Sequence, residues 1–370
     1  MSTTPKSVAL DVFIRMNTSS VALSAFDIVV AQVEEATGQS LHDLVSELKA
    51  YAPTVSEYAD PADLIMSVAA LRQDHTPTQA SYQRLEVKDL VSEWDRVVEG
   101  IRWAIEFLET EAVFDGQRLP TGAVIPVLAA LYDVVPESLD ALGNARTLLR
   151  KYLWRAFLTR RYENSAATRS LQDLRGLRAV LRDGQSENNV PIFDESESPL
   201  PSPEELKRAG WPKAKDILAR GILAVAIRMG APDLADGAPA SRQHLAKREY
   251  HHLFPHALLT EEGGLSSQES YRALNCALFT WNTNRNISAK EPLQYLRERT
   301  ERSALGEAEV RLRLSKHLIP FDALAVGGYE QLTDKAQRAR RIREDYEHFL
   351  DERAQMLITP IRTLCDGQTL

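Results

Sequence analysis

The chain has 370 residues, of which 44% are hydrophobic and 26% are charged, and its formal net charge is −8. This composition is typical of a globular protein with a sizeable core, and the length allows two or three domains. No apolar run approaches the roughly 20 residues of a membrane-spanning helix, and no secretory signal is evident. We therefore expect a cytoplasmic protein without a membrane partner. The two cysteines, Cys276 and Cys365, argue against a disulfide framework or a zinc knuckle.

Apolar residues recur with a period near 3.6 along most of the chain, which predicts a mostly α fold, a multi-helix bundle. Ser24, Ser40 and Ser138 stand where N-caps are expected, Pro61 opens a helix, and Gly38 ends one. The segment 87–108 carries one long apolar stripe and is predicted to be a single amphipathic helix. The predicted helices cover residues 24–36, 40–48, 61–71, 87–108, 124–132, 138–161, 168–181, 212–229, 291–300, 307–314 and 333–357.

The most informative stretch is residues 250–255, Tyr-His-His-Leu-Phe-Pro, which is followed by Asn275 and Asn284. Pro255 predicts the end of a first strand just after the histidine pair. A loop through residues 263–264, a second strand at 276–280 and a helix near residue 292 complete a small ββα unit inserted late in the helical chain. Because successive strand residues face opposite sides, His251 and His252 should point in opposite directions.

These residue types suit the hydrolysis of a phosphodiester. A neutral imidazole with a pKa near working pH is a suitable general base, and we assign this role to His252. His251 and Asn284 offer nitrogen and oxygen ligands to a divalent metal, Mg²⁺ or Mn²⁺, which takes up charge on the phosphate. Asn275 should brace the loop that carries the base, through its side-chain amide. Arg285 and Lys290 are candidates for contacts to phosphate.

The run 251–255, then Asn275, and Asn284 with Arg285 and Lys290 resemble the HNH core of GmrSD-type restriction proteins. They are also similar to the HNH domain of RNA-guided CRISPR nucleases, in which two asparagines have the same separation. In that second group an Asp stands at the place of His251, and this difference bears on metal preference. The resemblance implies a ββα-metal fold and a DNA endonuclease that hydrolyses foreign or modified double-stranded DNA in a restriction or antiviral defence system.

Three outer stretches resemble the same proteins, at residues 13–24, 161–174 and 349–353. The family's N-terminal motif, Asp-Gly-Gln-Gln-Arg, is absent. The resemblance therefore implies a ParB-like nucleotide-binding partner chain or a missing N-terminal half. It also implies a division into a remnant of that N-terminal domain with linking helices (1–50), a helical domain (51–183), an acidic linker or mobile loop (184–203), an HNH nuclease domain (204–300) and C-terminal helices (301–370).

Basic residues are concentrated in two regions despite the negative net charge. Residues 146–182 contain ten Lys or Arg and two acids, and residues 335–343 contain five basic residues and no acid. Phosphate contacts to DNA are expected from the second region, at Lys335, Arg338, Arg340, Arg341 and Arg343. Arginine-rich helices are equally typical of a solvated face with intrahelical ion pairs. The alternative function is a non-enzymatic helical interaction or DNA-binding module with a decayed HNH core.

Overall fold

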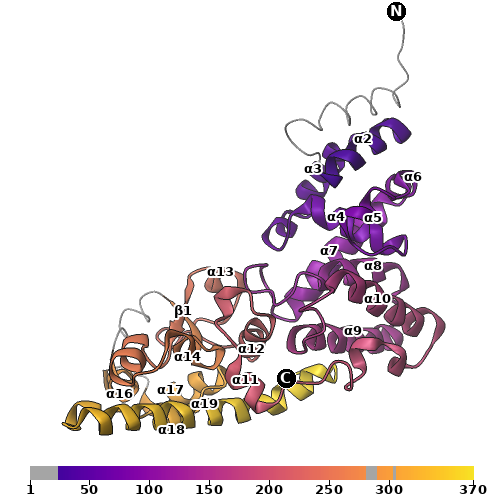
Figure 1. The fold of residues 1–370 in the computed structure, drawn as a ribbon. Coiled ribbons are helices and arrows are strands. Elements are labelled where there is room, and N and C mark those ends of the chain that lie inside the picture. Colours follow the sequence, from indigo (N-terminus) through magenta and orange to yellow (C-terminus); the bar gives the residue numbers. More distant parts are fainter. Residues whose placement is uncertain (1–23, 281–289, 303–305) are drawn as a thin grey trace, which may run out of the picture. The chain divides into compact units, whose positions relative to one another are not determined.

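The computed structural model describes residues 24–280, 290–302 and 306–370. They form mostly helices, together with one two-stranded antiparallel sheet (Figure 1). The contacts between residues divide the chain into two units. Unit 1 comprises Met1–Leu108, Gly122–Ala145 and Arg161–Glu197, and unit 2 comprises Glu109–Thr121, Arg146–Arg160 and Ser198–Leu370. None of the described helices is both long and apolar enough to span a membrane. The stretch 13–18, one of those that resemble restriction proteins, lies outside the described residues.

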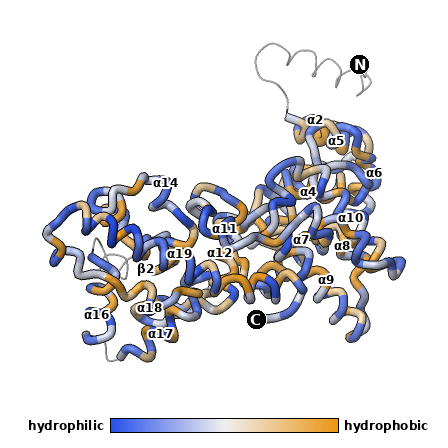
Figure 2. Tube along the Cα trace, turned by 60° about the horizontal axis from the view of Figure 1, so that its bottom comes forward, coloured by the Kyte–Doolittle hydropathy of each residue, from blue (hydrophilic) through white to orange (hydrophobic). Residues whose placement is uncertain are grey.

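All the regular elements described in unit 1 are helices. Ser24 and Ser40 cap its first two helices by accepting hydrogen bonds from the backbone N–H of Asp27 and Asp43, and Gly38 ends the first helix at φ 72°, as predicted. Another helix, α8, is hydrophobic along nearly its whole length (Figure 2), and all of its residues are buried. The elements are α2 (Ala25–Thr37), α3 (Leu41–Tyr51), η2 (Pro53–Glu57), α4 (Pro61–Arg72), α5 (Gln79–Tyr82), α6 (Val87–Ser92), α7 (Trp94–Thr110, to Leu108), α8 (Val124–Leu131), η3 (Tyr132–Val134), the start of α9 (Leu139–Leu158), α10 (Ala166–Asp183), η4 (Glu187–Asn189) and η5 (Pro191–Phe193).

The single helix predicted at 87–108 is wrong, because the chain forms two helices, α6 and α7, that meet at Glu93. The Glu93 carboxylate accepts hydrogen bonds from Nε and Nη2 of Arg72 on α4, at 3.2 and 2.7 Å. The helix predicted to start at Thr168 begins earlier, at Ala166. The acidic stretch 184–203 carries η4 and η5, and both Val190 and Ile192 are fully buried. The last passage of the chain from unit 1 to unit 2 falls within this stretch.

Unit 2 combines helices with the sheet. Its longest helix, α19, contacts α11, α12 and α18 and the short turns η7, η8 and η9. The helix continues past residue 357, where the sequence predicted its end, and through Pro360. Ile361 and Leu364, which follow the proline, are still buried. The remaining elements are α11 (Pro203–Arg208), η6 (Pro212–Ala214), α12 (Ile217–Arg228), α13 (Arg242–Leu245), β1 (Arg248–His252), η7 (Leu258–Glu262), α14 (Ser267–Ser270), η8 (Ala273–Asn275), β2 (Cys276–Thr280), α16 (Pro292–Arg302), α17 (Gly306–Lys316), α18 (Phe321–Leu324), η9 (Tyr329–Gln331) and α19 (Lys335–Cys365).

The helix predicted at 212–229 is also wrong in its first part. A 3-10 turn, η6, is followed by Lys215 at φ 65°, a left-handed conformation that stops a helix. The α-helix then starts after Asp216, whose Oδ1 accepts the N–H of Ala219 at 2.9 Å. The start of this α-helix is therefore set by its N-cap, Asp216, and not by the position of Pro212.

The two strands lie where the sequence predicted them. They pair antiparallel, with His251 opposite Ala277 and His252 opposite Cys276. Among the described residues α16 is the next helix along the chain, and the Tyr295 hydroxyl of this helix donates a hydrogen bond to the Leu253 carbonyl at 3.0 Å. Residues 281–289, between β2 and α16, lie outside the described residues, and a ββα unit of the HNH type is a proposal taken up below.

Candidate functional site

His252 is the last residue of β1, and it lines a pocket of about 660 Å³. Its ring stacks on Trp211, with centroids 4.3 Å apart and planes 18° apart. The ring of Tyr271 meets it edge-on at 4.7 Å, and Tyr271 is 40% exposed. We name this space the His252 pocket, and it is lined by Gln117, Arg118, Trp211, Lys213, Ala246, Arg248, Glu249, Tyr250, His252 and Tyr271.

The Nε2 atom of His252 is buried and has no hydrogen-bond partner among the described residues. Trp211 and Tyr271 pack against the ring that carries this nitrogen. Burial, together with charge repulsion from the neighbouring His251 and His256, lowers the pKa of His252 to about 4. The imidazole is therefore neutral near pH 7, which is the form that a general base requires.

Asn275 fixes the backbone that follows His252. Its side chain is fully buried, and its Oδ1 accepts the N–H of Phe254 at 2.7 Å. Its Nδ2 donates to the carbonyl of Phe254 at 3.0 Å and to that of Ser270 at 3.1 Å. The Asn275 amide thus binds both the N–H and the carbonyl of Phe254, two positions after the candidate base. It also links the loop that contains Phe254 to the end of α14. A side chain of another shape cannot satisfy these three buried groups.

His251 lies on the opposite side of the strand from His252, on the same face as Phe279. It is 6% exposed, and its ring centroid is 6.0 Å from that of Phe279. Among residues 24–280, 290–302 and 306–370, no group of three His, Cys, Asp or Glu is arranged to hold a metal ion. The described chain thus offers His251 as one nitrogen ligand of a divalent ion, and a complete site needs further donors. The predicted second ligand, Asn284, lies outside the described residues, as does Arg285.

A third histidine, His256, also lies near the pocket, in the loop after the strand. Its Nδ1 is 2.6 Å from the Ser270 hydroxyl, and its ring centroid is 5.1 Å from that of Tyr271. Ser270 is itself fully buried and contributes its carbonyl to Asn275. His256 therefore orients the segment that carries Tyr271, and the pair forms one hydrogen-bonded unit with the loop after His252.

The predicted DNA-contact residues are largely engaged within the chain. Lys290 forms an ion pair with Glu298 at 2.6 Å, and Arg341 pairs with Asp345 at 3.0 Å. Arg338 donates to the Leu332 carbonyl, Arg343 donates to the Gly263 carbonyl, and Arg340 lies 3.8 Å from Glu344. Lys335 is exposed at the start of α19. For Arg340 and Arg341 the partners are acids one turn later on α19, which is the arrangement of a solvated helix face.

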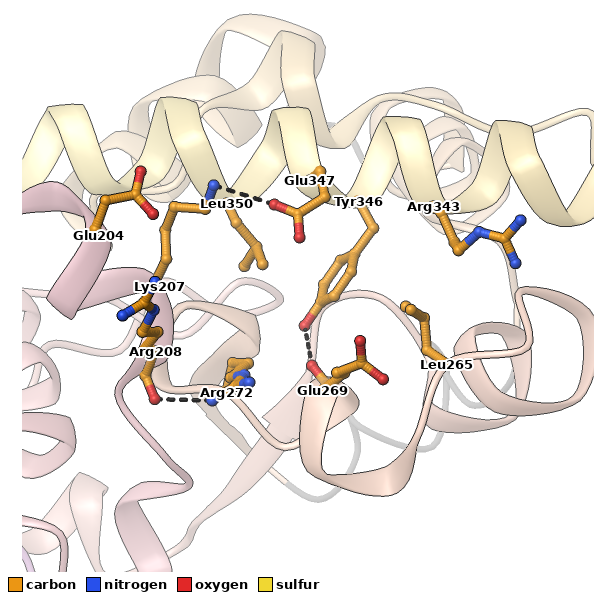
Figure 3. A pocket seen from close by; sticks show the side chains of 10 residues that line it. All are labelled: Glu204, Lys207, Arg208, Leu265, Glu269, Arg272, Arg343, Tyr346, Glu347 and Leu350. Atoms are coloured by element: carbon orange, nitrogen blue, oxygen red, sulfur yellow. Dashed lines mark hydrogen bonds and ion pairs between the residues drawn. The ribbon is translucent and has the colours of Figure 1, made fainter.

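A second pocket, of about 450 Å³, is lined by residues of α11, α14 and α19 (Figure 3). Lys207 reaches Glu347 at 3.1 Å and Asp351 at 2.5 Å, and the Tyr346 hydroxyl donates to the Glu269 carbonyl at 2.9 Å. Lys207 is thus paired with two acids, and Arg272 and Arg343 donate to backbone carbonyls, so three of the four basic side chains of this pocket are already engaged within the chain. The His252 pocket, with a buried imidazole nitrogen in its wall, is the better candidate for chemistry.

Sequence reasoning missed Trp211, Tyr271 and Arg353 as parts of this site. Trp211 and Tyr271 come from loops that no spacing rule connects to the histidine pair. Arg353 is 2% exposed and donates to the carbonyls of Leu274 and Cys276, which flank Asn275. Its place in the stretch 349–353, which resembles the last helix of restriction proteins, was the one available signal.

No protein-family model matches this chain, and no curated protein matches it either.

Proposed function

We propose that this chain is a metal-dependent DNA endonuclease of the HNH type, which nicks one strand per active centre in a restriction or antiviral defence system. The observation that carries the proposal is the combination of His252 with Asn275. The neutral imidazole of His252 ends a strand beside a pocket, and the side-chain amide of Asn275 fixes the loop that follows through three hydrogen bonds. This combination supports a base that must be held in one orientation toward an attacking water.

The roles of the other residues follow from their positions. Once its nitrogen is uncovered, His252 accepts a proton from the water that attacks phosphorus. Lys213 lines the same pocket and provides positive charge for a phosphate, and Arg118, which also lines it, forms an ion pair with Asp115. His251, on the other face, suits a divalent metal as a neutral nitrogen ligand, with Asn284 as the proposed second ligand. When bound, such an ion supplies charge to the scissile phosphate and the leaving oxygen.

Nicking should depend on a divalent metal. We expect the protein to convert supercoiled plasmid to the open circle with Mg²⁺ or Mn²⁺ and to lose this activity in excess EDTA. The measurement is an agarose-gel time course, with metal added back in excess over EDTA as the control. Undiminished nicking in EDTA would contradict both the metal assignment and the HNH class.

The pH dependence of nicking should reflect the unusual pKa of His252. Since kcat/KM reports the ionisation of the enzyme before it binds substrate, its acid limb should be centred near about pH 4 rather than near about 6.5. The base is lost only as pH falls through the lowered pKa, so activity should stay level between about pH 7.5 and about pH 5.5. The measurement is kcat/KM across this range at constant ionic strength. An acid limb centred near the ordinary histidine value would contradict the buried environment of this base.

The second candidate function, a helical interaction or DNA-binding module with a decayed HNH core, has two observations in its favour. The catalytic nitrogen of His252 is covered, and no three-residue metal cluster is found in the described part of the chain. DNA binding without any nicking, with Mg²⁺ or Mn²⁺ present, would favour this module over the endonuclease.

A further inference from the structure

The wall of the His252 pocket combines aromatic rings with basic side chains. Trp211, Tyr250 and Tyr271 form one cluster, with ring centroids of Trp211 6.4 Å from Tyr250 and 5.2 Å from Tyr271. Arg118, Lys213 and Arg248 line the same pocket, and Glu249 is the one acid in the lining. Aromatic rings beside cations are the combination that binds single nucleic-acid bases and their phosphates.

Several buried polar atoms of this wall have no hydrogen-bond partner in the described part of the chain. They are the Nε atoms of Arg118 and Arg248, the hydroxyl of Tyr250 and Nε2 of His252. The other guanidinium nitrogens of these arginines are used. Nη1 of Arg118 pairs with the Asp115 carboxylate and its Nη2 donates to the Leu245 carbonyl at 2.6 Å, and Arg248 donates to the Ala231 and Ala238 carbonyls. Buried donors without acceptors are costly, and their gathering in one wall indicates a site that a polar ligand completes.

Tyr271 is the most exposed ring of this wall. It is 40% exposed, whereas Trp211 and Tyr250 are only partly exposed, and its ring stands at 84° to the imidazole of His252 with centroids 4.7 Å apart. A flat apolar ligand that stacks on Tyr271 or takes its place would uncover Nε2 of His252. Binding of the ligand and exposure of the base would then be one event.

We propose that the His252 pocket receives a single unstacked nucleotide of the DNA, with its base against Tyr271 and Trp211 and its phosphate toward Lys213 and Arg118. The proposal deepens the endonuclease function and rests on it for the identity of the polymer. The pocket volume of about 660 Å³ is within the range of roughly 300–1,000 Å³ typical of small-molecule sites. A base inside a regular duplex is stacked on both faces and cannot enter such a pocket, so the protein should prefer DNA with an unpaired base.

The test is a binding measurement in EDTA, so that no cleavage occurs. Fluorescence anisotropy of the full chain would compare a fully paired duplex, the same duplex with one bulged base, and the bulged duplex with an abasic residue at that place. One base stacked on an aromatic ring is worth about 1–3 kcal/mol, so we expect the bulged duplex to bind about tenfold more tightly than the paired one. The abasic bulge should lose this advantage.

Two variants identify the side chain responsible. Tyr271→Ala should abolish the preference for the bulge, and Tyr271→Phe should retain it, because stacking needs the ring and not the hydroxyl. Lys213→Gln should weaken binding of the bulged duplex more than that of the paired one and reduce the salt dependence of binding the bulged duplex, as expected for a contact to the phosphate of the unstacked nucleotide. Because Tyr271 and Lys213 are exposed, the folding of each variant is checked by its thermal melting temperature.

The results separate this proposal from the proposed activity. Equal binding of paired and bulged duplexes, or a preference that survives in Tyr271→Ala, would overturn the nucleotide pocket. Plasmid nicking by the same preparation would still support the endonuclease. A bulge preference that Tyr271→Ala removes, in a protein that never nicks, would uphold the pocket and reject the endonuclease.

Discussion

Replacing His252 by alanine should abolish plasmid nicking and leave DNA binding intact. Its imidazole is neutral at working pH and ends β1 at the rim of the pocket, and Asn275 fixes the backbone just beyond it. A positioned general base contributes about 10²–10⁴-fold to the rate, so the variant should lose at least two orders of magnitude. The measurement is the initial rate of open-circle formation, with anisotropy on the same DNA as the readout of binding.

The matched control is His348→Ala, which removes an exposed histidine from α19 and should nick at the parental rate. Because His252 stacks on Trp211, the melting temperature of His252→Ala must be compared with that of the parent. A variant that is folded, binds DNA and nicks within a few-fold of the parent would show that His252 is not the base. The activity would then have to be assigned to another group of the pocket.

The parts of the fold that the sequence predicted correctly are those with local causes. The caps at Ser24 and Ser40 use groups within three residues, and the two strands are marked by β-branched or aromatic residues and by Pro255. The prediction of a single helix at 87–108 was wrong because the feature that accompanies the break at Glu93 is not local. The carboxylate of Glu93 accepts a hydrogen bond from Arg72, a residue on another helix, and no period in the sequence shows that partner.

The same distinction applies to the candidate site. The histidine pair and Asn275 were predicted as candidate site residues because they form a pattern within one stretch of chain. The ring that stacks on His252 comes from Trp211. The burial that lowers the pKa of His252 depends on this contact and on the contact with Tyr271. Such contacts arise only when the chain has folded, so a sequence predicts the identity of a base more readily than its basicity.

Removing the guanidinium of Arg353 should be among the most damaging single changes to the stability of unit 2. This side chain is 2% exposed and donates to four carbonyls, those of Leu274, Cys276, His317 and Leu318. Burial lowers its pKa to about 10, so the group is still charged near neutral pH. In the described part of the chain its hydrogen-bond acceptors are carbonyls and not carboxylates, so the carbonyl dipoles stabilise its positive charge.

Arg353→Met keeps an apolar stem of similar length and leaves these carbonyls buried without a donor. Each unsatisfied buried polar group costs about 1–3 kcal/mol, and partial relaxation lowers the sum, so we expect a loss of about 3–5 kcal/mol in the free energy of unfolding. The carbonyls of Leu274 and Cys276 flank Asn275, so nicking should also fall in the fraction that stays folded. Urea unfolding followed by tryptophan fluorescence measures the first effect, and the plasmid assay measures the second.

Arg362→Met provides the matched control, because Arg362 is exposed on the same helix. Its unfolding free energy should stay within about 0.5 kcal/mol of the parent, as is usual for surface substitutions. A loss below about 1 kcal/mol for Arg353→Met would mean that water or a shifted donor satisfies the four carbonyls, and that Arg353 does not hold the strand. If stability falls as expected but the folded fraction nicks at the parental rate, Arg353 supports the fold of unit 2 without positioning Asn275.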